Sequence, residues 1–314
     1  MASTTKIMTA LLALERCSGD EVVIIGEESV GIEGSSAYLK AGEEVTMREL
    51  TYALMLQSAN DAAVAIACYI SDGVEDFATL MNERAAEMGL QSTSFENPHG
   101  LDSSEHYTTA EELAIIASTA LENPAFREIA STYKKTFVTG ERTRTYVNHN
   151  KLLNMYDGCI GVKTGFTKKC GRCLVGAAER DGLTFVTVTL DAPSDWADHK
   201  NMLDFGYATL EKITLAEAGE YRYSLPVLEG EGEEIIVSNK DSLSVIKNAT
   251  EHEVESQVNL GRYTLAPISE GDVLGEVVFK IDGEVCGRVP LVAEFSINKK
   301  KNEGIFGRII SHFR

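Results

Sequence analysis

The start of the chain places a serine and a lysine one helical turn apart in an apolar segment. Ser3-Thr4-Thr5-Lys6 runs directly into Ile7-Met8-Thr9-Ala10-Leu11-Leu12-Ala13-Leu14-Glu15, and these helix formers predict a buried helix over residues 3–15. Positions i and i+3 share a helical face, with Cβ atoms about 5–6 Å apart. A lysine whose pKa is lowered by burial can activate a serine hydroxyl. The alternative is an ordinary helix start, capped by Ser3 or Thr4, with Lys6 reaching into solvent.

Composition narrows the class of protein. A chain of 314 residues with 44% hydrophobic and 25% charged side chains is long enough for two globular domains. The formal net charge of −19 argues against a nucleic-acid partner, because phosphate binding requires a basic surface. No apolar run is long enough to predict a membrane span. Met1 is followed at once by the first helix, so no signal peptide is expected in this chain.

The cysteines do not predict a disulfide framework or a metal site. The six cysteines are scattered, and Cys170-Gly171-Arg172-Cys173 is the one C-x-x-C. Without a second pair or a histidine cluster it does not predict zinc, and the surrounding pattern is not that of a redox enzyme. Mostly free, partly buried thiols are therefore expected, and no cofactor or metal.

The pattern of elements changes along the chain. Capping boxes at Thr46/Glu49 and Thr109/Glu112 predict helix starts. The expected helices span 47–57, 61–70, 74–88, 109–121 and 195–210. The expected strands span 21–25, 133–138, 143–148, 162–166, 172–179 and 183–190. From about residue 216 short alternating strands predict a small all-β module.

The C-terminal tail has its own pattern. Three lysines, 299–301, precede apolar residues at 305, 306, 309, 310 and 313, a spacing that lines one face of a helix. A basic amphipathic helix is typical of segments that lie in a membrane interface. A terminal helix packed on the protein's own surface is the alternative.

Two further short motifs join the first. Ser58-Ala59-Asn60 interrupts two apolar helices, and Lys163-Thr164-Gly165 enters a strand. His99 lies in the loop Asn97-Pro98-His99-Gly100-Leu101 and is expected to act as a loop hydrogen-bonding residue. Each motif alone is weak. In this order, S-x-x-K, S-x-N and K-T-G resemble the trio of penicillin-binding proteins and class A β-lactamases.

The sequence around the trio resembles the D-alanyl-D-alanine carboxypeptidases of peptidase family S11, the low-molecular-mass penicillin-binding proteins. The similar stretches are residues 2–9, 97–101, 106–110 and 157–165. The resemblance implies an α/β (α+β) transpeptidase fold with a helical subdomain and an antiparallel sheet. It implies a serine peptidase catalytic domain at 1–212, a small β-rich domain at 213–296 and a basic amphipathic tail at 297–314.

The resemblance also implies roles for the site residues. Ser3 would attack the carbonyl between two terminal D-alanines of the peptidoglycan stem peptide, and Lys6 would take its proton. Ser58 would relay a proton to the departing amine, and Asn60 would orient Lys6 and the substrate. Four residues of the strand expected at 162–166 would bind substrate. Lys163 and Thr164 would contact the terminal carboxylate, and Gly165 would lie along the peptide. The N–H groups of Phe166 and Ser3 would form the oxyanion hole.

β-Lactam antibiotics would then acylate Ser3, and the tail would contact the membrane on the extracytoplasmic face. A class A β-lactamase is the first alternative. It would need a glutamate for deacylation, and no E-x-x-x-N occurs between Ser58 and Lys163. The second alternative is a catalytically impaired fragment that only binds penicillin or peptidoglycan. Family members carry about two strands before the nucleophile, so a three-stranded meander with an exposed edge at 183–190 is expected.

Overall fold

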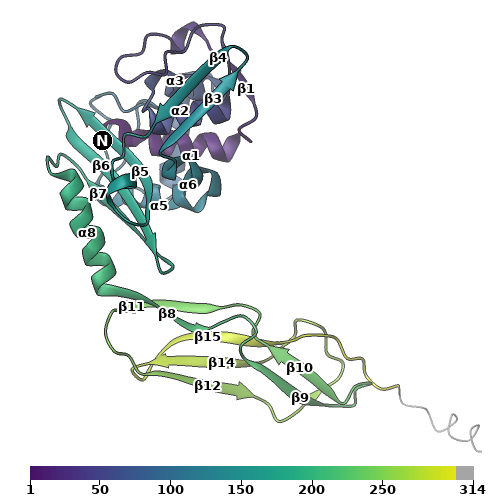
Figure 1. The fold of residues 1–314 in the computed structure, drawn as a ribbon. Helices are drawn as coiled ribbons and strands as arrows, with labels where there is room; N and C mark the ends of the chain where they lie inside the picture. The colour runs from purple at the N-terminus through teal and green to yellow at the C-terminus, as the bar shows by residue number, and fades with distance from the viewer. Residues whose placement is uncertain (302–314) are drawn as a thin grey trace, which may run out of the picture. The chain divides into compact units, whose positions relative to one another are not determined.

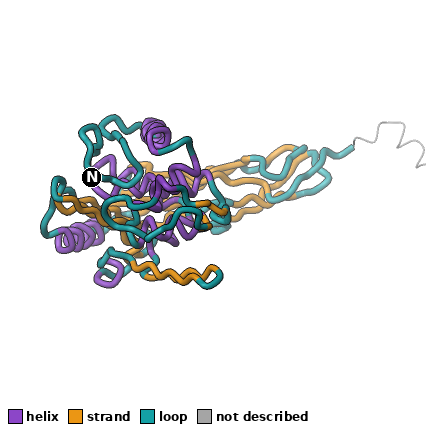
Figure 2. The backbone as a smooth tube through the Cα atoms, turned by 90° about the horizontal axis from the view of Figure 1, so that it is seen from above, coloured by secondary structure: helices purple, strands orange, loops and turns teal. Residues whose placement is uncertain are grey.

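The computed structural model describes residues 1–301. Contacts between Cα atoms divide the chain into two compact units, one over Met1–Tyr207 and one from Ala208 onward. Figure 1 shows the elements of each unit, and Figure 2 shows the second unit as strand and loop.

The first unit combines helices with three small antiparallel sheets. Its helices are η1 (Ala2–Thr5, 3₁₀), α1 (Lys6–Arg16), η2 (Glu27–Ser29, 3₁₀), α2 (Met47–Leu56), α3 (Asn60–Ile70), α4 (Val74–Glu87), α5 (Ala110–Glu122), α6 (Pro124–Ser131), α7 (Leu152–Met155) and α8 (Asp195–Thr209). Its strands are β1 (Val22–Ile24), β2 (Glu44–Thr46), β3 (Lys134–Thr139), β4 (Arg142–Val147), β5 (Cys159–Thr167), β6 (Gly171–Arg180) and β7 (Leu183–Thr189).

The helix starts follow from side-chain caps. Thr46 accepts a hydrogen bond from the Glu49 N–H at 3.2 Å, and Thr109 accepts one from Glu112 at 3.1 Å. These bonds satisfy backbone donors that have no partner within the helix, as the capping boxes predicted. Helix α6 was not predicted, although Asn123 caps it and a proline occupies its first turn. That combination is a regular helix-start signal.

The sheet β5–β6–β7 is an antiparallel meander. Its central strand is covered on both faces: Leu174 and Ala178 pack in the cluster that contains Leu203 of α8, whereas Val175 and Ala177 belong to the main core with α1, α5 and α6. This two-sided burial explains why β6 is a nearly continuous apolar run. Within the described residues β7 pairs only with β6, so the meander and its edge agree with the expectation from the sequence.

The second unit is all-β, as expected. The strands are β8 (Leu210–Ala216), β9 (Arg222–Leu228), β10 (Glu234–Ser238), β11 (Leu243–Asn248), β12 (Val254–Leu260), β13 (Thr264–Leu265), β14 (Val273–Ile281) and β15 (Glu284–Ala293). Six of them form a sheet in the order β12–β14–β15–β10–β9–β13, and β11 pairs with β8. Leu291, Phe279, Ile235 and Val277 lie at the centre of a separate hydrophobic core.

Two sequence expectations concern membranes. The helix expected in the tail falls on residues 302–314, which lie outside the described residues. Among residues 1–301, no helix combines the length and the apolar character needed to cross a bilayer.

Candidate active site

Ser3 and Lys6 lie on a tighter turn than the sequence predicted. The predicted continuous helix over 3–15 begins instead as the 3₁₀ turn η1, and the α-helix α1 starts at Lys6. Side chains at i and i+3 eclipse one another in a 3₁₀ turn. The Lys6 Nζ therefore lies 3.0 Å from the Ser3 Oγ, which gives the serine a base within hydrogen-bonding distance.

Lys6 is fully buried, at 0% exposure, so the alternative in which its side chain reaches solvent is wrong. Its Nζ donates to the Asn60 Oδ1 at 2.7 Å and to the His99 carbonyl oxygen at 2.5 Å. Burial, and next the positive charge of Lys163, hold the pKa of Lys6 well below its ordinary value. Desolvation of an ammonium favours the neutral amine, which is the form able to accept a proton.

Asn60 is held in place from the corner between α2 and α3. Ser58 turns this corner with a φ of +59°, a left-handed conformation that is uncommon for a residue other than glycine. The Asn60 N–H donates to the Ser35 carbonyl at 2.7 Å, and its side-chain amide donates to the Glu33 carbonyl. Because the Asn60 backbone and the NH₂ group of its side chain are both held, the side-chain oxygen faces Lys6, whose Nζ donates to it.

A second lysine lies beside Ser58. Lys163 on β5 is 1% exposed, and its Nζ lies 3.1 Å from the Ser58 Oγ and 3.0 Å from the Thr164 carbonyl oxygen. Burial lowers the pKa of Lys163 to about 7. The site thus contains two serine–lysine pairs, Ser3 with Lys6 and Ser58 with Lys163.

Two glycines let the backbone segments meet. A Cβ added at Gly165 would lie 3.1 Å from the backbone nitrogens of Ser3 and Thr4, so β5 runs directly against η1. A Cβ at Gly100 would lie 1.9 Å from the Ala2 carbonyl oxygen, and Gly100 has a φ of +87°. The loop that carries the His99 carbonyl therefore packs against the nucleophile turn without any intervening side chain.

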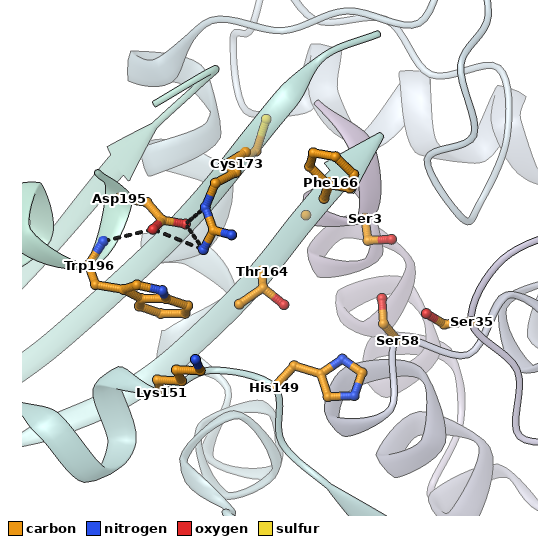
Figure 3. A pocket seen from close by; sticks show the side chains of 12 residues that line it. Ser3, Ser35, Ser58, His149, Lys151, Thr164, Phe166, Cys173, Asp195 and Trp196 are labelled. Carbon is orange, nitrogen blue, oxygen red and sulfur yellow. Dashed lines mark hydrogen bonds and ion pairs between the residues drawn. The ribbon is translucent and has the colours of Figure 1, made fainter. Parts of the chain in front are cut away.

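Ser3, Ser58 and Gly165 line a pocket of about 390 Å³ (Figure 3). The hydroxyls of Ser3 and Ser58 lie on its helical side, Thr164 on β5 lies across from them, and Phe166 is drawn next to Ser3. The remaining lining residues are Ser35, His149, Lys151, Arg172, Cys173, Asp195 and Trp196. Within residues 1–301 no cluster of three or more His, Cys, Asp or Glu side chains is placed to hold a metal ion.

The far wall of the pocket was not predicted. Arg172 makes two hydrogen bonds of 3.0 Å to the Asp195 carboxylate and lies 5.8 Å above the Trp196 ring. A bidentate pair holds the planar guanidinium in one orientation. No sequence signal joins these residues, because β6 and the N-terminus of α8 meet only in the folded chain.

Comparison with known protein families identifies the family of this chain. Residues 1–194 match the family model described as D-alanyl-D-alanine carboxypeptidase, peptidase family S11, and residues 210–299 match the C-terminal domain of penicillin-binding protein 5. The chain belongs to the D-alanyl-D-alanine carboxypeptidase family. The resemblance drawn from the three motifs is therefore confirmed, as is the mixed α/β fold followed by an all-β domain.

Individual carboxypeptidases are similar over most of the chain. The D-alanyl-D-alanine carboxypeptidase of Bacillus subtilis is 32% identical over 309 residues, covering 95% of this chain and 79% of that protein. A D-alanyl-D-alanine carboxypeptidase of a Streptomyces species is 37% identical, covering 66% of this chain and 78% of that one. The solved structure of penicillin-binding protein 5 from Haemophilus influenzae matches with a TM-score of 0.69 and 28% identity, covering 95% of this chain and 90% of that one.

In this member of the carboxypeptidase family, backbone atoms complete the lysine environment. His99 is a loop hydrogen-bonding residue, as predicted: its Nδ1 accepts from the Leu101 N–H at 3.2 Å. Its carbonyl contact with Lys6 was missed, because any residue type supplies a carbonyl. His106 was also missed. Its ring accepts from the Glu96 N–H at 3.0 Å and lies 2.7 Å from the Thr5 hydroxyl, which ties this loop to the nucleophile turn.

Proposed function

We propose that the chain is a serine-type D-Ala-D-Ala carboxypeptidase that removes the terminal D-alanine of peptidoglycan stem pentapeptides through an acyl-enzyme on Ser3. The observation that carries the proposal is the buried Lys6 amine, 3.0 Å from the Ser3 hydroxyl. The first unit, Met1–Tyr207, would be the catalytic domain, and the second unit, from Ala208 onward, the accessory β domain; a boundary at 212/213, as expected from the sequence, would cut strand β8. The family and the relatives support the substrate class.

The hydrogen bonds of Lys6 suit a neutral base. A neutral amine has two N–H donors and one lone pair, and the Lys6 Nζ has three neighbours. The Asn60 and His99 oxygens can only accept, so they take both N–H groups. The lone pair then faces Ser3, whose O–H donates to it. On attack, the proton passes from the Ser3 Oγ to the Lys6 Nζ while the Oγ bonds to the substrate carbonyl carbon. A positioned base typically contributes about 10²–10⁴-fold.

The second pair would handle the leaving group. Ser58, hydrogen-bonded to Lys163, would pass a proton to the departing D-alanine amine. Lys163 and Thr164 would attract the terminal carboxylate. Gly165 lets the peptide lie along β5 as an added strand. The N–H groups of Ser3 and Phe166 would stabilise the oxyanion, a contribution of roughly 3–4 kcal/mol per donor in a comparable protease site. Water then hydrolyses the ester on Ser3, which releases the shortened peptide and restores the Ser3 hydroxyl.

The test uses a β-lactam as the acylating probe. Intact-mass analysis after incubation with benzylpenicillin should show a single adduct that is absent in Ser3→Ala. Ser58→Ala is the matched control, because it removes the other serine of the two pairs and should still acquire the adduct, more slowly. An adduct that persists in Ser3→Ala rejects Ser3 as the nucleophile.

Two further measurements separate the alternatives. Release of D-alanine from a peptide ending in D-Ala-D-Ala identifies a carboxypeptidase, whereas an adduct without D-alanine release identifies a protein that only binds penicillin. Rapid turnover of penicillin, in place of a long-lived adduct, would identify a β-lactamase.

We also propose peripheral contact with the extracytoplasmic face of the membrane through the tail at 297–314. The support is the sequence pattern of three lysines before a five-residue apolar set, since each basic residue near an anionic surface contributes about 1 kcal/mol. Co-sedimentation with phosphatidylglycerol vesicles should fall when the chain ends at Lys301, a truncation that keeps Ile297 in the core of the β domain. Equal binding by both chains would refute the contact.

A further inference from the structure

Two cysteines lie at the end of the pocket where β5 turns into β6. Cys170 is in the turn, and Cys173 is on β6 opposite Gly165 in the strand register. The Sγ atoms are 4.0 Å apart. Cys173 is 2% exposed and lines the pocket (Figure 3). The proposed acylation chemistry uses neither thiol.

The spacing of the two thiols is close to that of a disulfide. A disulfide bond is about 2 Å long, so a closure of about 2 Å between the sulfurs would join them. The other cysteines, at positions 17, 68, 159 and 286, have no sulfur-to-sulfur contact of this kind among the described residues. No role for this C-x-x-C followed from the sequence. In the structure its two thiols lie next to each other.

We propose that Cys170 and Cys173 form a redox-active dithiol, which closes to a disulfide by exchange with small-molecule disulfides and thereby slows acylation of Ser3. The effect on acylation rests on the proposed function, whereas disulfide formation does not. Substrates of the family lie in the cell wall, outside the cytoplasm, where disulfides can persist.

The exchange balances without any further reactant. The Cys170 thiolate, on the more accessible of the two residues, attacks one sulfur of the disulfide RSSR, forming Cys170–S–SR and releasing RS⁻. Cys173 then loses its proton to solvent and attacks the Cys170 Sγ, which releases a second RS⁻. The two cysteines are oxidised by two electrons and RSSR is reduced to two thiols. Cys173 is only 2% exposed, so a small-molecule disulfide reaches Cys170 first.

The turn links this exchange to the oxyanion site. The Cys170 N–H donates to the Thr167 Oγ1 at 3.1 Å, and the Thr167 hydroxyl donates to Asp102 at 2.9 Å. Cys173 is fixed by burial and by strand pairing, so closure must move Cys170. That movement strains the Thr167 contacts next to Phe166, whose N–H is the proposed oxyanion donor. A displacement of about 1 Å at such a site can cost about 10²-fold in rate.

The experiment compares reduced protein with protein treated with bis(2-hydroxyethyl) disulfide. Peptide mapping after alkylation should show a Cys170–Cys173 disulfide with the loss of two hydrogen atoms, and dithiothreitol should reverse it. The rate of Ser3 acylation by a fluorescent penicillin should fall by about 10-fold or more and recover on reduction. Cys170→Ala should be insensitive to the oxidant, and the matched control Cys68→Ala should respond as the wild type does.

The outcomes are separable. Free, alkylated thiols at both positions after treatment would overturn the proposal, as would an oxidised protein with an unchanged acylation rate. If the reduced protein forms no adduct on Ser3, the proposed function fails. The disulfide map and the emission of Trp196, the chain's single tryptophan and a residue of the same pocket, then decide whether the dithiol closes and alters the pocket.

Discussion

Gly100 offers a direct test of the contact between the His99 loop and the nucleophile turn. In Gly100→Ala, the new Cβ would lie 1.9 Å from the Ala2 carbonyl oxygen and 2.9 Å from the Thr5 Oγ1. Real Cβ atoms essentially never approach within 3.0 Å, so the loop and the turn must separate by more than about 1 Å. The His99 carbonyl would then withdraw from Lys6, and Ser3 would shift relative to its base.

Two costs follow from this substitution. The left-handed backbone costs alanine about 1–2 kcal/mol, which lowers the melting temperature by about 2–8 °C in a unit of this size. The displacement costs acylation about 10²-fold, as expected for a misplacement of about 1 Å. Acylation by a fluorescent penicillin and thermal unfolding would be measured on the same preparation.

Gly89 supplies the matched control. It also has a left-handed backbone, with a φ of +77°, but nothing lies within 4 Å of its added Cβ. Gly89→Ala should therefore lose about the same 1–2 kcal/mol from backbone strain and acylate at the wild-type rate. The reasoning is refuted if Gly100→Ala acylates within about threefold of wild type, or if Gly89→Ala loses as much rate.

Three further predictions concern charge and the sheet edge. Lys163 has a pKa of about 7 in the folded chain, against an ordinary value of 10.5. Between these two pH values the unfolded chain holds more protons than the folded chain, so the free energy of unfolding rises with pH. Lys163→Met should flatten this rise, measured by urea unfolding at several pH values. The same variant removes a positive charge that lowers the pKa of Lys6, so the pKa of Lys6 should rise. The fall of the acylation rate at acid pH should then begin at a higher pH. An unchanged pH profile would contradict the coupling between Lys163 and Lys6. β7 has one unpaired side in the described chain. Thr184→Lys places a charge on this exposed edge and should reduce self-association of the protein, measured by sedimentation velocity. Equal association of the variant and the wild type would show that the edge is not the contact.

Local signals in the sequence predicted most of the fold. The caps at Thr46 and Thr109 determine where α2 and α5 begin, and they were visible because each depends on two residues three positions apart. Helix α6 was missed although Asn123 and Pro124 were present, since its eight residues are too few for a clear apolar period.

The site residues also differ in how visible they were in the sequence. The structure places Ser3, Lys6 and Asn60 in one hydrogen-bonded set and Ser58 with Lys163 in a second. These residues were predicted because their three short motifs, in this order, resemble those of a known family. The carbonyl oxygens of Glu33, Ser35 and His99 leave no sequence pattern, because every residue has a carbonyl oxygen. The Arg172–Asp195 pair was missed because its members come from β6 and α8 and meet only after folding.

The distance along the chain between the two lysines has a consequence for how the protein matures. Ser3 and Lys6 are made before the groups that enclose Lys6, which are Asn60, the His99 loop and finally β5 with Lys163. Burial, and next the charge of Lys163, lower the pKa of Lys6. Contacts across such separations require the closure of a long loop, which makes them slow to form. Until β5 packs against η1, Lys6 is a hydrated ammonium and Ser3 an ordinary hydroxyl. Reactivity toward a β-lactam therefore reports completed tertiary structure, and a radiolabelled or fluorescent penicillin would count correctly folded molecules during refolding.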